Sequence, residues 1–158
     1  MTYADGRKIY DADSHVMETR EWLDPYLDKD IKAQVRPLYG HKRNRIDDLL
    51  DKAKARKGDT AAAAKALENP IAGPKGWIAA GAFDPAERTQ VLDQFGFDGQ
   101  LVFGTAGLGL LRNAKDDGIL YGGARAHNDA MAAFCSHDKR LMGVAFVPLD
   151  NPQRALEE

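Results

Sequence analysis

The residues of this sequence that could do chemistry gather near its start. They are Asp11, Asp13 and His15. A strand over residues 8–16 would place all three on one face, because side chains alternate along a strand with period two. Two carboxylates and an imidazole are costly to desolvate unless a partner satisfies them, and a divalent metal ion satisfies both kinds of ligand. The alternative is a surface Asx-turn, in which Ser14 and the aspartates bind nearby backbone N–H groups.

The composition predicts one soluble, globular domain. At 158 residues the chain can bury an ordinary core, and 44% apolar with 29% charged residues is typical of a folded protein. A net charge of −2 gives no electrostatic case for nucleic acid or an anionic membrane surface. No run reaches the roughly 18 apolar residues of a transmembrane helix, and the N-terminus lacks the apolar core of a signal peptide. We therefore expect a small-molecule substrate as partner, with neither nucleic acid nor membrane.

Cysteine usage indicates a reducing compartment. The single cysteine, Cys135, cannot form an internal disulfide, so the cytoplasm is the expected location. Its apolar, helical setting predicts a buried and inert thiol.

The chain divides into an irregular and a regular part. Residues 20–82 are predicted to be an excursion from the main fold, with helices over 45–57 and 60–67 and a loop over 69–81. In residues 83–158, Asp84 and Pro85 start a helix and Gly96 ends it. The elements predicted after it are a buried strand over 99–105, a loop at 107–109, a flexible break at 118–123, a helix over 124–137 and an apolar strand over 141–148.

Alternating strands and helices of this kind indicate an α/β fold with a parallel sheet, either open or closed into a barrel. Residues 150–158 begin another helix, with a capping residue and a proline at its first position, and the sequence stops within its second turn. Such a short helix is marginal alone, so we expect a truncated chain. A compact, complete domain is the alternative.

The remaining histidines and the basic cluster have ordinary explanations. His41, His127 and His137 do not follow apolar strands, and we expect structural or solvated roles for them. The basic cluster at 41–45 could bind an anion, but a solvated face explains it as well.

Several stretches together resemble the amidohydrolase-related family of metal-dependent (β/α)8 barrels, which includes decarboxylases of aminocarboxymuconate semialdehyde and of hydroxybenzoates. The opening Asp11-Ala12-Asp13-Ser14-His15-Val16, followed by Glu18 and Trp22, resembles the start of that family. The resemblance continues over 87–98 and is strongest over 128–149. It spans nearly the whole chain apart from residues 28–80, which lie within the excursion.

The resemblance implies that residues 1–158 are the N-terminal part of a TIM-like barrel, truncated after about three strands, with its site at the carboxyl ends of the strands. Asp13 and His15 match a two-ligand metal motif, often His-x-His, with Asp13 replacing the first histidine. Zinc is the first candidate, and the oxygen ligand gives weight to manganese. Asp11 would support the ligands or form a structural hydrogen bond. Phe103 and Thr105 would line the pocket.

The implied activity is that of a metal-dependent hydrolase or decarboxylase acting on a small carboxylate, aromatic or not, or on an amide or ester. The family's remaining ligands and its catalytic base come from the second half of the barrel, for which this chain has no counterpart, so we expect weak metal binding and little catalysis from it alone. One alternative is a non-catalytic fragment that needs a complementary chain and self-associates through open strand edges. Another is a haloacid-dehalogenase-type phosphatase, with Asp11 as nucleophile and Asp13 as acid/base.

Overall fold

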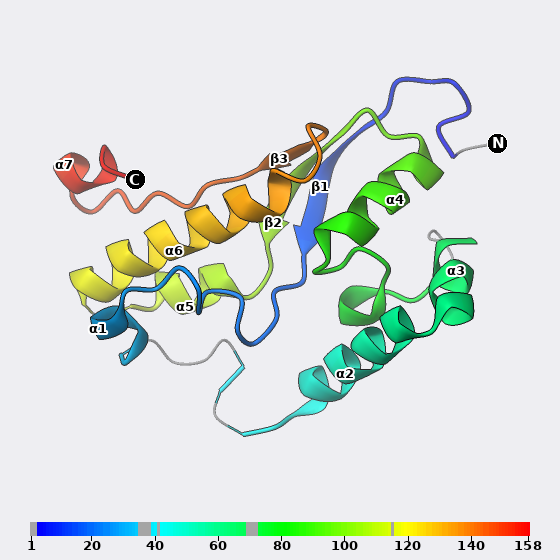
Figure 1. Cartoon of the computed structure of the whole chain (residues 1–158). Coiled ribbons are helices and arrows are strands. Elements are labelled where there is room, and N and C mark those ends of the chain that lie inside the picture. The colour runs from blue at the N-terminus through cyan, green and yellow to red at the C-terminus, as the bar shows by residue number, and fades with distance from the viewer. Residues whose placement is uncertain (1–2, 35–38, 41, 69–72, 115) are drawn as a thin grey trace.

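A small parallel sheet forms the centre of the fold. The computed structural model describes residues 3–34, 39–40, 42–68, 73–114 and 116–158. Within these ranges three strands, β1 (Tyr10–Val16), β2 (Gly99–Gly104) and β3 (Leu141–Gly143), pair in parallel in the order β1-β2-β3 (Figure 1). The prediction of a mixed α/β fold with a parallel sheet is therefore confirmed.

Helices account for most of the remaining regular structure. They are α1 (Lys29–Lys32), α2 (Arg45–Gly58), α3 (Thr60–Glu68), α4 (Pro85–Phe95), α5 (Gly107–Arg112), α6 (Asp117–Cys135) and α7 (Pro152–Ala155), with a 3-10 turn at Gly76–Ile78. In α4 the side chain of Asp84 accepts the N–H of Glu87, and Gly96 ends the helix with a left-handed φ of 72°. Among the described residues, no helix has both the length and the apolar character that crossing a bilayer requires.

Two predicted breaks are wrong, because the structure is helical there. Residues 107–109 begin α5, and residues 118–123 lie within α6. A glycine costs about 1 kcal/mol relative to alanine inside a helix. Close packing offsets this cost at Gly123, where a Cβ would stand 2.3 Å from Cδ2 of Leu111. Gly123 therefore allows α5 and α6 to approach each other.

The last strand is shorter than predicted. β3 ends at Gly143, whereas an apolar strand was expected over 141–148. Beyond it, the side chain of Asn128 on α6 accepts the N–H of Phe146 at 2.8 Å and donates to its carbonyl oxygen at 3.0 Å. A side chain of the covering helix thus takes the backbone bonds that a neighbouring strand would make.

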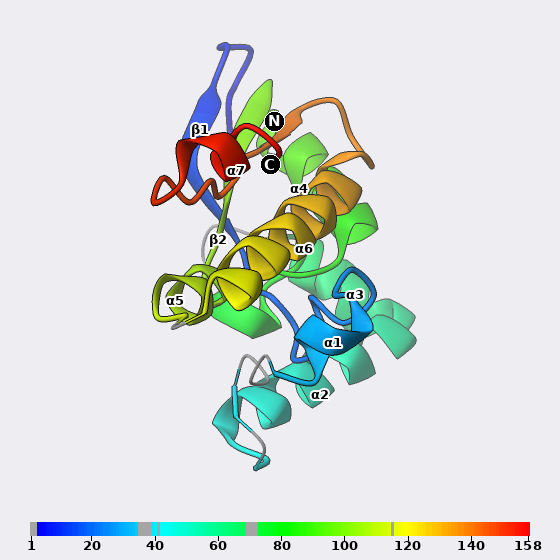
Figure 2. The same cartoon turned by 90° about the vertical axis from the view of Figure 1, so that its left-hand side faces the viewer.

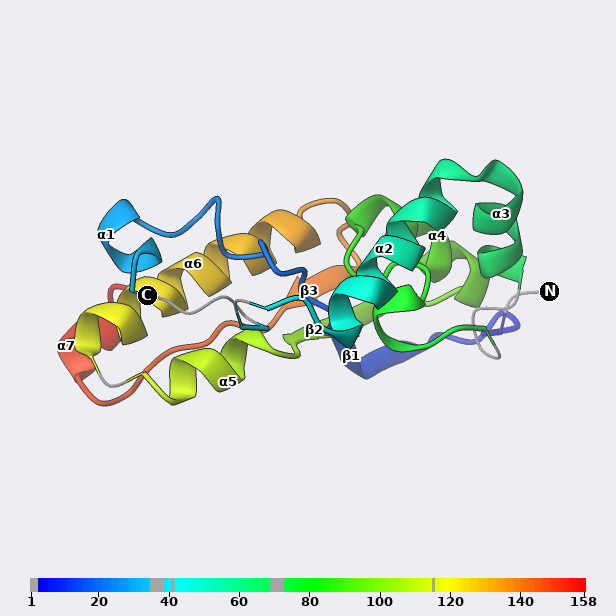
Figure 3. The same cartoon turned by 90° about the horizontal axis from the view of Figure 1, so that it is seen from below.

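The core lies between the sheet and the two longest helices of the regular part. Figure 2 shows α4 and α6 on one side of the strands, and Figure 3 shows the same arrangement from below. The buried cluster between these layers consists of Val16, Leu92, Val102, Met131, Phe134 and Leu141. On the opposite face, Tyr10, Leu101 and Met142 are exposed. We call these the covered face and the open face of the sheet.

A β-bulge interrupts β1. Asp11 pairs with Gln100 and Ser14 with Val102, so three steps along β1 match two along β2. The extra residue brings Asp11 to the covered face, where Nε2 of Gln100 donates to its Oδ2 at 3.1 Å. The strict alternation expected from the sequence, with Asp11 beside His15 on one face, is therefore wrong.

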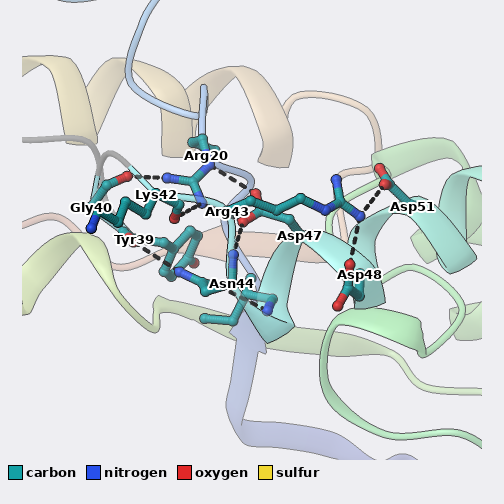
Figure 4. A network of polar contacts seen from close by, with 10 residues as sticks. Arg20, Tyr39, Gly40, Lys42, Arg43, Asn44, Asp47, Asp48 and Asp51 are labelled. Atoms are coloured by element: carbon teal, nitrogen blue, oxygen red, sulfur yellow. Dashed lines mark hydrogen bonds and ion pairs between the residues drawn. The ribbon is translucent and has the colours of Figure 1, made fainter.

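Ion pairs hold the excursion at 20–82 together and also attach it to the rest of the fold. Arg20 donates to Asp47 in the first turn of α2, and to the carbonyl oxygens of Gly40 and Lys42 (Figure 4). The Arg20 guanidinium is the main cause that lowers the pKa of Asp47 to about 2. Arg56 of α2 donates to both carboxylate oxygens of Glu87 at 2.8 Å, which links the excursion to α4.

The basic cluster at 41–45 is partly neutralised by its neighbours. Arg43 pairs with Asp48 and Asp51 of α2, and its side chain is largely exposed (Figure 4). Asn44 caps α2, because its Oδ1 accepts the N–H of Ile46 at 2.9 Å. His41 lies outside the described residues.

Candidate metal site

Asp13 and His15 lie together at the carboxyl end of β1. Nε2 of His15 is 3.6 Å from Oδ1 of Asp13, and their side chains are 39% and 92% exposed. Two ligand atoms of one tetrahedral ion, each about 2.0–2.1 Å from the metal, are about 3.4 Å apart. The two side chains therefore fit one divalent ion almost as they stand.

The hydrogen bonds of Thr105 determine which nitrogen of His15 carries its proton. The Thr105 hydroxyl donates to the carbonyl oxygen of Val16 at 2.8 Å, which uses its single hydrogen. Nδ1 of His15 lies 3.1 Å from the same Oγ1, so this geometry favours a hydroxyl that accepts there and a proton on Nδ1. Nε2 then has a free lone pair on the side of Asp13, as a metal ligand requires.

Phe103 supports the same ring from the neighbouring strand. His15 and Phe103 are paired across β1 and β2, and their rings stack with centroids 5.8 Å apart at 29°. Phe103 is half-buried and lies beside the pair. It therefore limits the motion of the imidazole, whether or not it also touches a substrate.

Asp11 forms structural hydrogen bonds. Besides its bond from Gln100, its Oδ1 accepts the N–H of Asp13 at 3.0 Å. This bond stabilises the bulged backbone that directs Asp13 away from the covered face. Asp11 thus has a supporting position next to the candidate ligands and lies on the other face from His15.

Arg88 of α4 is a supporting residue that sequence reasoning missed. It is buried, and its guanidinium donates to Ser14 Oγ at 2.7 Å, to the His15 carbonyl oxygen at 2.7 Å and to the Gly81 carbonyl oxygen at 2.6 Å. Burial lowers the pKa of Arg88, and the charge of Asp11 acts in the opposite direction. One signal in the sequence could have found it. Residue 88 is at helical spacing from the apolar positions 91, 92 and 95, which places it on the buried face of α4.

A hollow of about 450 Å³ adjoins Asp13 and His15 at the edge of β1 that does not pair with β2. Asp13 and His15 line it on one side, and α4 lines it on the other through Arg88 and Val91. The candidate ligands are thus accessible to a small molecule.

Among the residues that the structure describes, no third candidate ligand lies next to the pair. Within the described ranges, no three or more His, Cys, Asp or Glu side chains form a group that could hold a metal. His127 is fully buried in α6, and burial lowers its pKa more than the nearby Glu18 raises it. His137 is exposed just beyond α6, and Cys135 is half-buried, with a thiol pKa raised by burial. The described part of the chain thus offers two candidate ligands at this position.

Compared with known proteins, the chain matches no family model, and a search of curated proteins finds no match.

Proposed function

We propose that Asp13 and His15 are two ligands of a divalent metal ion in a hydrolase or decarboxylase of the amidohydrolase-related type. The observation that carries this proposal is the position of the His15 ring. Its Nε2 lies 3.6 Å from Asp13 Oδ1, while its Nδ1 forms a hydrogen bond with the Thr105 hydroxyl. Imidazole with one carboxylate suits zinc, and the oxygen ligand keeps manganese as the second candidate.

We also propose that the sheet is the opening part of a (β/α)8 barrel. In such a barrel the helices form an outer ring, and the other face of each strand points into a closed, side-chain-filled interior. Sequential strand order, α4 and α6 on one face, and exposed Leu101 and Met142 on the other support this assignment. An open doubly wound sheet is the alternative, because it also begins with neighbouring parallel strands.

The chemistry depends on what the ion contacts. When bound, a metal lowers the pKa of coordinated water towards ~7 or polarises a carbonyl or carboxylate of the substrate. Asp13 and His15 would hold it, while Thr105 and Phe103 keep the imidazole in its binding orientation. The accessible hollow beside the pair suits a small substrate. From the resemblance, the substrate class we propose is a small carboxylate, aromatic or not, or a small amide or ester.

Titration calorimetry with zinc and then manganese tests this proposal on the whole chain. We expect micromolar or weaker zinc binding, because two protein ligands are fewer than the three or four of ordinary zinc sites. Asp13→Asn and His15→Gln should each weaken it at least tenfold, whereas Asp129→Asn, an exposed aspartate on α6, should leave it unchanged. Zinc binding that ignores both site variants would refute the metal site, and submicromolar binding would refute the two-ligand account.

A second candidate function is a non-catalytic chain that works only with a complementary one. The open face and the unpaired edges of β1 and β3 within the described sheet favour it, because such edges bind further strands. The phosphatase alternative has less support, because the Asp11 carboxylate already accepts hydrogen bonds from the side chain of Gln100 and the backbone N–H of Asp13. Activity lost on mutation of Asp11 but kept on mutation of Asp13 would reverse this ranking.

A further inference from the structure

A buried carboxylate lies directly behind the candidate metal site. Glu18 follows His15 by three residues, and its side chain is fully buried. Its Oε1 accepts the N–H groups of Thr105 at 2.9 Å and Gly107 at 3.0 Å, and its Oε2 accepts that of Ala106 at 2.9 Å. Three donated N–H groups offset the cost of burying the charge, and they fix the loop after β2 on the segment after β1.

The space around this carboxylate leaves no room for adjustment. A Cβ on Gly104 would stand 2.6 Å from Cε1 of His127 and 3.0 Å from Oε1 of Glu18. A Cβ on Gly107 would stand 3.2 Å from Nδ1 of His127. The fully buried ring of His127 thus packs close to the carboxylate from the side of α6, and both side chains are shielded from water.

Glu18 and the candidate ligand His15 are connected through Thr105. The N–H of Thr105 is held by Glu18, and its hydroxyl is oriented by the carbonyl oxygen of Val16. Only a lone pair of that hydroxyl is left for Nδ1 of His15. We infer that Glu18 is a positioning residue for His15: by fixing Thr105, it keeps the imidazole proton on Nδ1 and the lone pair of Nε2 towards Asp13.

This inference rests on the proposed function, since its purpose is to present a metal ligand, but its test does not. The structural alternative is that Glu18 only caps the loop at 105–107 and affects stability alone. The positioning role and the purely structural role predict different effects of Glu18 variants on the tautomer of His15 in the metal-free protein. Two-dimensional ¹⁵N NMR of the imidazole reads that tautomer directly at a pH where His15 is neutral.

The variants separate positioning from stability. In Glu18→Gln, an amide NH₂ replaces an acceptor and faces backbone N–H groups, so the bond to Thr105 weakens. We expect the wild-type His15 to carry its proton on Nδ1 and the variant to show mixed tautomers. The control is Glu21→Gln, an exposed glutamate three residues on, which should keep the wild-type spectrum. Thr105→Val should also lose the preference, and Thr105→Ser should restore it.

Zinc titration of the same variants gives a second readout. We expect Glu18→Gln and Thr105→Val to bind zinc about 10- to 100-fold more weakly than the wild type, the usual effect of losing such a supporting residue. Should Glu18→Gln fail to fold, Thr105→Val decides.

A His15 ring that keeps its proton on Nδ1 in either folded variant overturns the inference, as does a wild-type ring protonated on Nε2. If the wild type shows the expected tautomer but binds no zinc, the proposed metal site fails while the positioning role of Glu18 stands.

Discussion

The two faces of the sheet differ in what covers them and in what they hold. On the covered face, Val16 and Val102 are fully buried beneath α4 and α6. On the open face, Leu101 and Met142 remain 38% and 42% exposed, although Leu101 directly precedes the buried Val102 in β2. The candidate ligand His15 lies on the open face, stacked on Phe103.

This difference separates stability from chemistry. Burying apolar area stabilises a fold in proportion to the area removed from water, so the covered face supplies most of the stabilisation. The open face contributes less and therefore tolerates a carboxylate and an imidazole whose lone pairs must remain available. Its apolar residues gain by being covered, whether by further strands or by another chain.

The largest expected effect distinguishes two leucines, one facing each side. Leu92 of α4 packs fully buried on the covered face, and Leu92→Ala should cost about 2–5 kcal/mol through lost contacts and a cavity. Leu101→Ala on the open face should cost about 1 kcal/mol or less. Urea denaturation of both variants measures the two free energies of unfolding. Equal losses would mean that the open face is covered in solution.

A pair of glycines tests the tight packing at the end of the covered face. Gly104→Ala forces a methyl group against the ring of His127 and should cost about 1–3 kcal/mol. Gly109→Ala is the matched control, because a Cβ there meets no atom within 4 Å and alanine favours the helix α5. Thermal denaturation should place the first variant below the wild type and the second at or above it. The opposite order would contradict the closed packing around Glu18.

The buried imidazole of His127 should make stability depend on pH. Burial lowers its pKa in the folded state, partly countered by Glu18, so below the ordinary value of ~6.5 the unfolded chain binds the extra proton. Stability is therefore complete above that pH and falls as the pH drops below it, by at most about 1.4 kcal/mol per pH unit.

Urea denaturation between pH 7.5 and 5.5 measures this dependence, and His127→Leu should flatten it. His137→Gln, at an exposed position, should not change it. Asp47, with its pKa of about 2, titrates far below this window. An unchanged slope in His127→Leu would show that another group is responsible.

The smallest expected effect concerns self-association through the open face and its edges. We predict that copies of the chain associate weakly, and that Leu101→Lys or Met142→Lys lowers the association constant roughly fivefold, equivalent to about 1 kcal/mol. Leu156→Lys changes a residue that is 84% exposed just after α7, and it serves as the control. Sedimentation velocity at several concentrations gives the constants. A control variant that weakens association as much as the other two would move the contact away from the sheet.

Local signals in the sequence predicted α2, α3 and α4 well. Asp84, Pro85 and Gly96 delimit α4 as expected, because capping and left-handed glycine act within a few residues of each other. The glycine-rich segment at 118–123 misled the prediction because its helix depends on Gly123 packing against Leu111, a contact that propensity does not contain. The role of Arg88 was missed for a similar reason, since its partners Ser14 and His15 lie more than seventy positions away.

By itself, the sequence determined the alternation of strands and helices that indicates a parallel α/β fold, the caps of helices such as α4 and the Asp13-x-His15 spacing. All of these arise from neighbours along the chain. Only the tertiary structure decided that a bulge separates Asp11 from His15, that the Thr105 hydroxyl lies against Nδ1 of His15 and that Glu18 accepts the N–H of Thr105. These features join β1 to β2 across more than eighty residues. Hydrogen bonds of that range depend on the folded geometry, which no local pattern of residues encodes.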